Sequence, residues 1–140
     1  PWLADLGRYP SWLDIVKRAD PVPDARPTAD ERGAVPGPAW SVDLRARLGP
    51  VARSKRLRMV RTVCEDDRVV RFERAEVDGR DHSSWVLDGK LVSTADGCWL
   101  TMTLQYAGGA LAPLVQRFLN DEIDRSGRRL VDLVASGQSA

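Results

Sequence analysis

Histidine, cysteine and lysine are scarce in this chain of 140 residues, which has one histidine, two cysteines and three lysines. Two cysteines are too few for a disulfide framework. Cys64 and Cys98 both lie in apolar stretches, so we expect two buried, reduced thiols. A structural metal site takes about four ligands, which this composition supplies poorly. We therefore predict neither a metal nor another cofactor.

Long hydrophobic runs are also missing. No run approaches the roughly 18 apolar residues of a membrane span, and no basic, apolar and small-residue series marks a signal peptide. The 43% of hydrophobic and 29% of charged residues are typical of a globular domain rather than a disordered chain. We predict a single cytoplasmic domain over residues 1–140 with no membrane span.

The charges nearly cancel, since the formal net charge is +1. One segment departs from this balance, because seven cations and no acid lie between Asp43 and Glu65: Arg45, Arg47, Arg53, Lys55, Arg56, Arg58 and Arg61. Such a patch steers anionic ligands, acidic proteins, membrane surfaces or RNA, or it is simply a solvated sheet face. Aromatic residues for base stacking are not interleaved with it, so we predict no specific nucleic-acid partner.

The first 39 residues divide into a helical and a proline-rich part. Apolar spacing over residues 1–18 predicts two short helices, broken at Tyr9-Pro10 because proline disfavours helical backbone in the residue before it. Ser11 is the expected N-cap of the second helix. Residues 20–39 contain five prolines and predict a long loop, which is an expected gate for a binding site.

From Trp40 onward the apolar pattern has period two. It predicts five antiparallel strands: 40–48, one through Leu57, Met59 and Val63, 68–77, 83–92 and 98–106. Asp96-Gly97 is a hairpin signal between the last two. After Gly108-Gly109 a stripe of period 3.6 from Leu111 to Leu133 predicts one long amphipathic helix. An α+β fold follows, in which this helix covers the apolar face of the sheet.

The element order and several short stretches resemble a known superfamily. "DLGRYPSWLDIV", with Asp5, Tyr9-Pro10 and Trp12, is similar to the close of the first helix in START-like proteins, specifically actinobacterial polyketide cyclase/dehydrase-like (SRPBCC) proteins. "HSSWVLDGKL" and "LTMTLQYAGG" are similar to their late strands. The resemblance covers essentially the whole chain, except that it implies a β-strand before the first helix, which this sequence starts too late to contain.

The resemblance implies a helix-grip fold, with a curved sheet around the last helix and an apolar cavity between them. The inward strand and helix positions would line that cavity: Trp40, Val42, Leu44, Leu57, Met59, Phe72, Arg74, Trp85, Leu87, Leu100, Met102, Leu104, Leu114, Phe118 and Leu119. The alternative is that these side chains fill the core and leave no pocket.

Strand 68–77 raises a conflict between alternation and charge. If Val70 and Phe72 point inward, Arg74 and Glu76 do so as well, and two buried charges must pair or meet a polar ligand such as a carboxylate. A bulge near Arg74 would instead turn Ala75 and Val77 inward. Glu122, one turn after Phe118, is a hypothetical partner for Arg74.

The function expected from this reading is binding of a hydrophobic small molecule, such as a lipid, quinone or polyketide. One alternative is a cyclase or dehydratase in the same cavity, with Arg74, Glu76, His82 and Glu122 as weak acid–base candidates. The favoured explanation of His82 is instead an exposed or satisfied histidine at a strand start. A protein-interaction module on the basic sheet face, and a homodimer, are further alternatives.

Overall fold

The structure, a computed structural model, describes residues 2–22, 37–48, 51–76, 82–107 and 112–137. Over these residues it contains a short 3-10 helix, η1 (Leu6–Ser11), then six strands and one long helix, α1 (Ala112–Gly137). The strands are β1 (Val16–Val22), β2 (Ala39–Leu48), β3 (Val51–Glu65), β4 (Val69–Arg74), β5 (Ser84–Thr94) and β6 (Gly97–Ala107).

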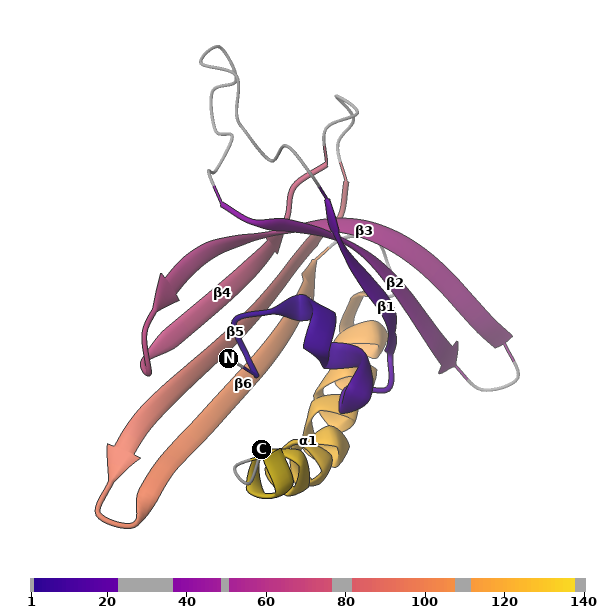
Figure 1. Cartoon of the computed structure of the whole chain (residues 1–140). Helices are drawn as coiled ribbons and strands as arrows, with labels where there is room; N and C mark the ends of the chain where they lie inside the picture. Colours follow the sequence, from indigo (N-terminus) through magenta and orange to yellow (C-terminus); the bar gives the residue numbers. More distant parts are fainter. Residues whose placement is uncertain (1, 23–36, 49–50, 77–81, 108–111, 138–140) are drawn as a thin grey trace.

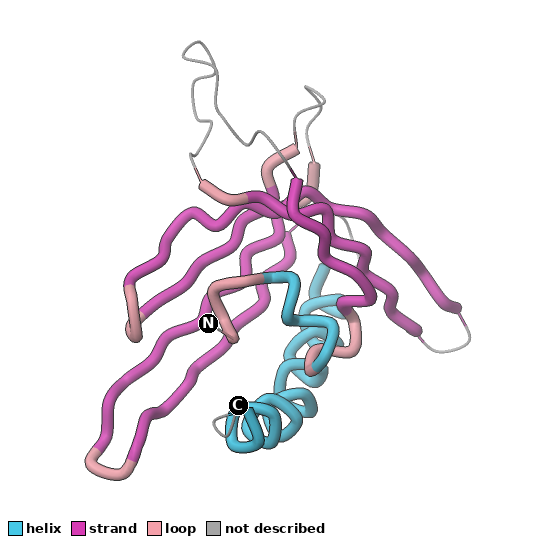
Figure 2. The backbone as a smooth tube through the Cα atoms, in the orientation of Figure 1, coloured by secondary structure: helices cyan, strands magenta, loops and turns pink. Residues whose placement is uncertain are grey.

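The strands form one antiparallel sheet in the order β1-β2-β3-β4-β5-β6, so every strand pairs only with its neighbours in sequence. The five strands predicted from the period of two correspond to β2–β6. The sheet is strongly curved, and η1 and α1 both lie on its concave side (Figures 1 and 2). The prediction of an α+β chain with an antiparallel sheet and a C-terminal helix is confirmed.

Helix α1 presents a mixed row of side chains to the interior. Leu119 and Leu130 are buried in the core, and the buried positions between them are Glu122 and Ser126. The helix contacts the sheet mainly at β6. An ion pair between Arg129 and Asp14 also ties it to the segment that follows η1. The C-terminal helix therefore lies over the β6 side of the concave face, and η1 lies over the β1 side.

The second short helix predicted after Ser11 is wrong. Residues 16–22 form the edge strand β1, in which Val16 lies opposite Leu44 and Pro21 lies opposite Trp40. Proline is tolerated here because an edge strand has backbone positions that need no partner. Ser11 is not an N-cap, since its hydroxyl donates to the carbonyl of Arg8. The β-branched Ile15 and Val16 favour a strand once β2 offers one to pair with.

The helix break predicted at Pro10 is also wrong, because η1 includes this proline. Asp5 caps η1 by accepting from the backbone N–H of Gly7 over 2.8 Å. A 3-10 turn of this length makes few hydrogen bonds, so the missing N–H of one proline costs it little. Tyr9, inside η1, contacts Phe72 of the sheet, and Trp12, at the C-terminal end of η1, packs against Tyr9.

The proline-rich stretch 20–39 lies largely outside the described residues. Its first residues, up to Val22, belong to β1, and Ala39 begins β2. The gate expected there falls on residues 23–36, outside the described part of the chain.

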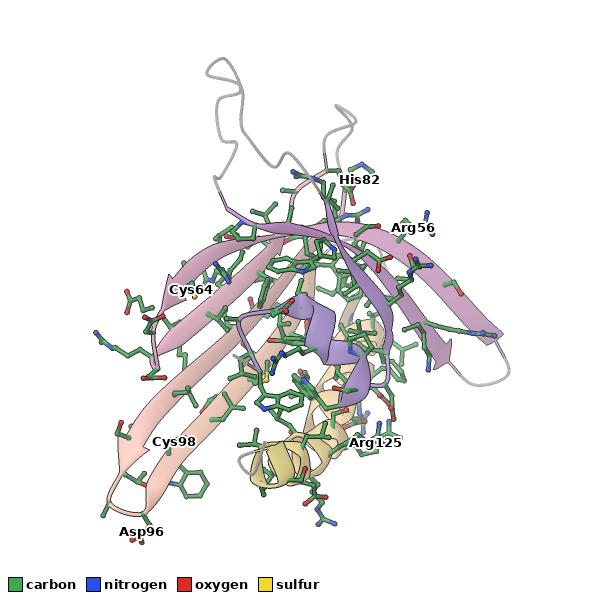
Figure 3. All side chains as sticks on the ribbon, in the orientation of Figure 1. Arg56, Cys64, His82, Asp96, Cys98 and Arg125 are labelled. Carbon is green, nitrogen blue, oxygen red and sulfur yellow. The ribbon has the colours of Figure 1, made fainter. Side chains whose placement is uncertain are left out.

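Both cysteines are exposed, contrary to the prediction of buried thiols. Cys64 lies near the turn that ends β3, and Cys98 lies near Asp96 at the tip of the β5–β6 hairpin (Figure 3). The apolar residues around them predicted burial, but the hairpin ends extend past η1 and α1 and are not covered by them (Figure 1).

Candidate functional site

The concave face of the sheet carries most of the residues predicted to line a cavity. Cross-strand pairs place Trp40 beside Met59 and Met59 beside Arg74, while Phe72, Leu87 and Leu104 form the neighbouring row. The buried members of the predicted set are Trp40, Val42, Leu57, Met59, Phe72, Trp85, Leu87, Leu104 and Leu119. Leu44, Leu100, Met102 and Phe118 are half-buried against them.

Leu114 differs from the other predicted lining residues. It is 56% exposed, so it does not face the core from the first turns of α1. The buried row of the helix begins later, at Leu119, and Val115 and Phe118 only flank it. The apolar stripe predicted from the sequence therefore wrongly included Leu114 at the N-terminal end of α1.

Aromatic side chains of the N-terminal segment fill the centre of the concave face. Tyr9 is fully buried and meets Phe72 edge-on, with ring centroids 5.9 Å apart. Phe72 also packs edge-on against Trp40, with ring centroids 5.5 Å apart. The rings of Tyr9 and Trp12 are tilted at 44° to each other, with centroids 4.8 Å apart. Burial raises the pKa of the Tyr9 phenol, whose hydroxyl donates to the carbonyl of Leu3. This part of the interior is packed protein.

A polar cluster lies at one end of the concave face, around Arg74. The Arg74 side chain is only 7% exposed, and its Nε donates to Glu76 Oε1 over 3.0 Å. One terminal nitrogen donates to the carbonyl and the hydroxyl of Ser83, and the other lies 3.2 Å from Nδ1 of His82. The same Glu76 oxygen accepts from the backbone N–H of Arg58.

This cluster resolves the conflict seen in the sequence. Arg74 keeps the inward register opposite Met59, and the nearby irregularity lies in β3, between Arg61 and Val63, rather than at Arg74. The predicted pairing of Arg74 with Glu122 is wrong. Glu122 pairs with Arg125 on its own helix, while Glu76, two residues along the chain, reaches Arg74 first. Val77, the other residue of the bulge hypothesis, lies outside the described residues.

The candidate acid–base groups are therefore split between two places. Arg74, Glu76 and His82 meet at the end of the sheet, whereas Glu122 lies on α1 beside Arg125 (Figure 3). Within the cluster, the Arg74 donors are directed at Glu76, Ser83 and His82. The arrangement holds the ends of β3, β4 and β5 together.

Two indole N–H groups in the core have no hydrogen-bond partner among the described residues. These are Nε1 of Trp12 and Nε1 of Trp85, which are both buried. An unsatisfied buried donor costs about 1–3 kcal/mol. The rings of Trp85 and Tyr106 pack with their centroids 4.9 Å apart, although Nε1 of Trp85 has no hydrogen-bond partner among the described residues.

A pocket of about 510 Å³ opens between the N-terminal segment and the ends of β1 and β2. We call it the N-terminal pocket, and its described lining is Ala4, Asp5, Arg8, Pro21, Val22, Pro38, Ala39, Trp40 and Arg61. Apolar surface from β1 and β2 meets two guanidinium groups there. Arg61 donates to the carbonyl of Ala4 over 3.0 Å, and Arg8 stacks over the ring of Trp2 at 5.0 Å.

Only Trp40 of this pocket was among the ligand-binding residues predicted from sequence. Arg61 was counted with the basic run of the sheet face, but it is half-buried and reaches back to the N-terminal segment. It lies opposite Phe72, beside the register shift of β3. No signal in the sequence marks that shift. Arg8 had no signal beyond its place in the "GRYPSW" turn.

In comparisons with protein-family models, curated proteins and solved structures, nothing matches this chain. Among the described helices, none has the length and apolar character needed to cross a membrane. The fold is a six-stranded antiparallel sheet with a C-terminal helix. Beside its N-terminal turn lies a mainly apolar pocket that is also lined by Arg8, Arg61 and Asp5.

Proposed function

We propose that this protein binds a small hydrophobic molecule that carries an acidic group, and that the N-terminal pocket is its site. The observation that carries the proposal is the composition of that pocket. Val22, Ala39 and Trp40 supply apolar surface, and Arg8 and Arg61 supply guanidinium groups. Ligand pockets combine apolar walls with a few placed polar groups in this way.

The two arginines favour an anionic head on the ligand. Guanidinium groups bind carboxylates through charge-assisted hydrogen bonds. Arg61 uses one of its five N–H donors on Ala4, so others are left for a ligand. Asp5 also lines the pocket, but its Oδ1 accepts from the backbone N–H of Gly7. A ligand with its head at the arginines and its body along β1 and β2 fits this distribution.

This proposal keeps the hydrophobic ligand expected from the sequence and changes its place. Tyr9 occupies the space next to Phe72 and Trp12 packs against Tyr9, so the N-terminal pocket is the better-supported site. We also infer a helix-grip arrangement of the START-like kind, which the curved antiparallel sheet with α1 on its concave side supports. The polyketide cyclase alternative has weaker support, because Glu76 and His82 are both hydrogen-bonding partners of Arg74.

Octanoate and 1-octanol form a matched pair of probes for this site, since they share the chain and differ in the head. We expect isothermal titration calorimetry to show octanoate binding about tenfold more tightly, because one charge-assisted hydrogen bond contributes about 1.5–3 kcal/mol. Arg8→Gln should remove most of that preference. Arg117→Gln makes the same charge change at an exposed position of α1 and should not.

Equal binding of the two probes, or no binding of either, contradicts the proposal. So does an equal effect of the Arg8 and Arg117 substitutions, since that would reflect overall charge rather than the pocket. Native mass spectrometry of the purified protein adds a check without a chosen probe. A co-purifying mass that is apolar and acidic is the expected result.

A further inference from the structure

The sheet has two edge strands, β1 and β6, and they differ in how open they are to pairing with a further strand. β1 carries three charged side chains and Pro21, and its register shifts between Val16 and Arg18. Charges, proline and an irregular register protect an edge strand from such pairing. β6 is 11 residues long, and its sequence, GCWLTMTLQYA, includes no charge and no proline. β6 is therefore the edge that remains open to a further strand.

Helix α1 closes one end of the β6 edge. The side chain of Gln116 accepts from the backbone N–H of Tyr106 over 2.8 Å. The same side chain donates to the carbonyl of Leu104 over 2.6 Å. Gln116 thus takes the place of a neighbouring strand at this end, and its contacts show which residues of β6 direct their backbone groups outward.

The other end of this edge, toward the hairpin tip, has unpaired backbone groups. Alternate residues of an antiparallel strand direct both their N–H and their C=O to the same side, and the β5–β6 register has no shift. The residues that face the edge in the same way as Leu104 and Tyr106 are therefore Cys98, Leu100 and Met102. Over the described residues, the outward backbone groups of these three have no hydrogen-bond partner.

Exposed apolar side chains lie at the same end of the hairpin. Trp99 is 73% exposed and Val92 is 63% exposed, and the two lie opposite each other on β6 and β5. Leu100, the next residue, packs against the core, so Trp99 lies on the convex face. Because Trp99 belongs to the edge strand, a strand added to β6 would lie directly beside it. Contiguous exposed apolar surface of this kind marks interaction sites.

We propose that β6 pairs antiparallel with β6 of a second copy of this chain, which gives a dimer with a continuous sheet. A second copy supplies what this edge requires, an uncharged, proline-free strand with apolar side chains on both faces. The open backbone groups are centred on Leu100, and a two-fold axis places the central residue opposite itself. Trp99 then lies opposite Thr101 of the second copy, and no charge is buried. The protected β1 edge disfavours pairing of β6 with β1, which would build an open filament.

Two substitutions at Thr101 test both the partner and the register. Thr101 is exposed, and in the proposed pair it lies diagonally across the two-fold axis from Thr101 of the second copy. Thr101→Lys and Thr101→Glu therefore each place like charges across the two paired strands, which destabilises the pairing. A mixture of the two variants places opposite charges there. Thr94→Lys is the control, since it adds the same charge at an exposed position on β5, which does not form the interface.

Sedimentation equilibrium gives the dimer dissociation constant of each variant. We expect a dimer of the 15.5 kDa chain, with the dissociation constant raised about fivefold by each Thr101 substitution, restored by mixing the two and unchanged by Thr94→Lys. A monomer over the whole concentration range overturns the proposal, and so do assemblies larger than two copies. An equal effect of Thr94→Lys, or a mixture that does not regain affinity, also overturns it. Octanoate binding at the N-terminal pocket is measured separately, so the two proposals fail independently.

Discussion

The guanidinium of Arg74 and the carboxylate of Glu76 form an ion pair at the end of the sheet, with Nε and Oε1 separated by 3.0 Å. Only 7% of the Arg74 side chain and 19% of the Glu76 side chain are exposed. The pair is therefore mostly shielded from water, and further bonds to Ser83 and Arg58 complete it. A charge pair in such a place stabilises the fold only while all of its partners are present.

Arg74→Met should destabilise the protein by about 2–3 kcal/mol, because it leaves a largely buried carboxylate without its cation. The methionine keeps the apolar part of the side chain, so the loss reports on the polar contacts. Urea denaturation gives the free energy of unfolding directly.

Arg68→Met is the matched control for that substitution. Arg68 pairs with Glu65 at 3.7 Å, but both side chains are more than half exposed. Exposed pairs contribute about 0–1 kcal/mol, so little change is expected. Equal losses in the free energy of unfolding for Arg74→Met and Arg68→Met would show that the Arg74–Glu76 pair stabilises the fold no more than an exposed pair does.

The alkaline stability of the protein should depend on Tyr9. Burial raises the pKa of its phenol, so the folded state holds the proton more tightly than the unfolded state. The stabilisation that this provides is fully present below the unfolded pKa of about 10 and is lost as the pH rises above it. Phenolate absorbance should show Tyr9 ionising together with unfolding.

Tyr9→Phe should flatten the decline of stability above pH about 10, since it removes the group that titrates. At neutral pH the same variant should lose about 1 kcal/mol, because the hydrogen bond to Leu3 is gone. An unchanged pH profile in Tyr9→Phe would contradict this account.

Two glycine substitutions should change stability in opposite directions. A Cβ at Gly37 would lie 2.3 Å from the carbonyl oxygen of Arg61, so Gly37→Ala forces the backbone apart and should cost about 1–3 kcal/mol. Gly127, inside α1, has open space around that position, and Gly127→Ala should gain up to about 1 kcal/mol in helix propensity. Thermal unfolding of both variants measures the two effects. A shift of both melting temperatures in the same direction would contradict the prediction.

Asp43 should titrate below the ordinary range of an aspartate. The hydrogen bond from Arg56 is the main cause of its lowered pKa, and the charges of Arg56 and Arg18 add to it. NMR titration of the side-chain carboxyl carbon measures this directly. In Arg56→Gln the midpoint should return toward about 3.9, the model-peptide value. Both groups are at the surface, so added salt should reduce the difference.

The sequence was sufficient to predict most of the secondary structure, because each strand from Trp40 onward alternates and α1 has a clear apolar stripe. It was not sufficient for β1. Ile15 and Val16 continue an apolar spacing that also fits a helix, and only pairing with β2 makes them a strand. The spacing of apolar residues along the sequence does not show that β2 lies beside this segment.

The candidate site was less predictable than the fold. The sequence left the direction of Arg74 open between the inward face and a bulge. Its hypothetical partner Glu122 was wrong, because α1 contacts the sheet mainly at β6 and Glu76 is the residue that reaches Arg74. The inward turn of Arg61 depends on a register shift in β3. The N-terminal pocket joins Arg8 to β1 and β2, a tertiary contact that no local spacing indicates.

The simple order of the sheet has a consequence for how the chain folds. Every strand pairs with the next along the chain, and the β2–β3, β3–β4 and β5–β6 hairpins each close a short loop, which loses little chain entropy. The contact between Arg129 and Asp14 joins residues 115 positions apart and encloses nearly the whole sheet. Contacts of high sequence separation are slow to form. We therefore expect the hairpins to form early and the docking of α1 against the N-terminal segment to be the late step that sets the folding rate.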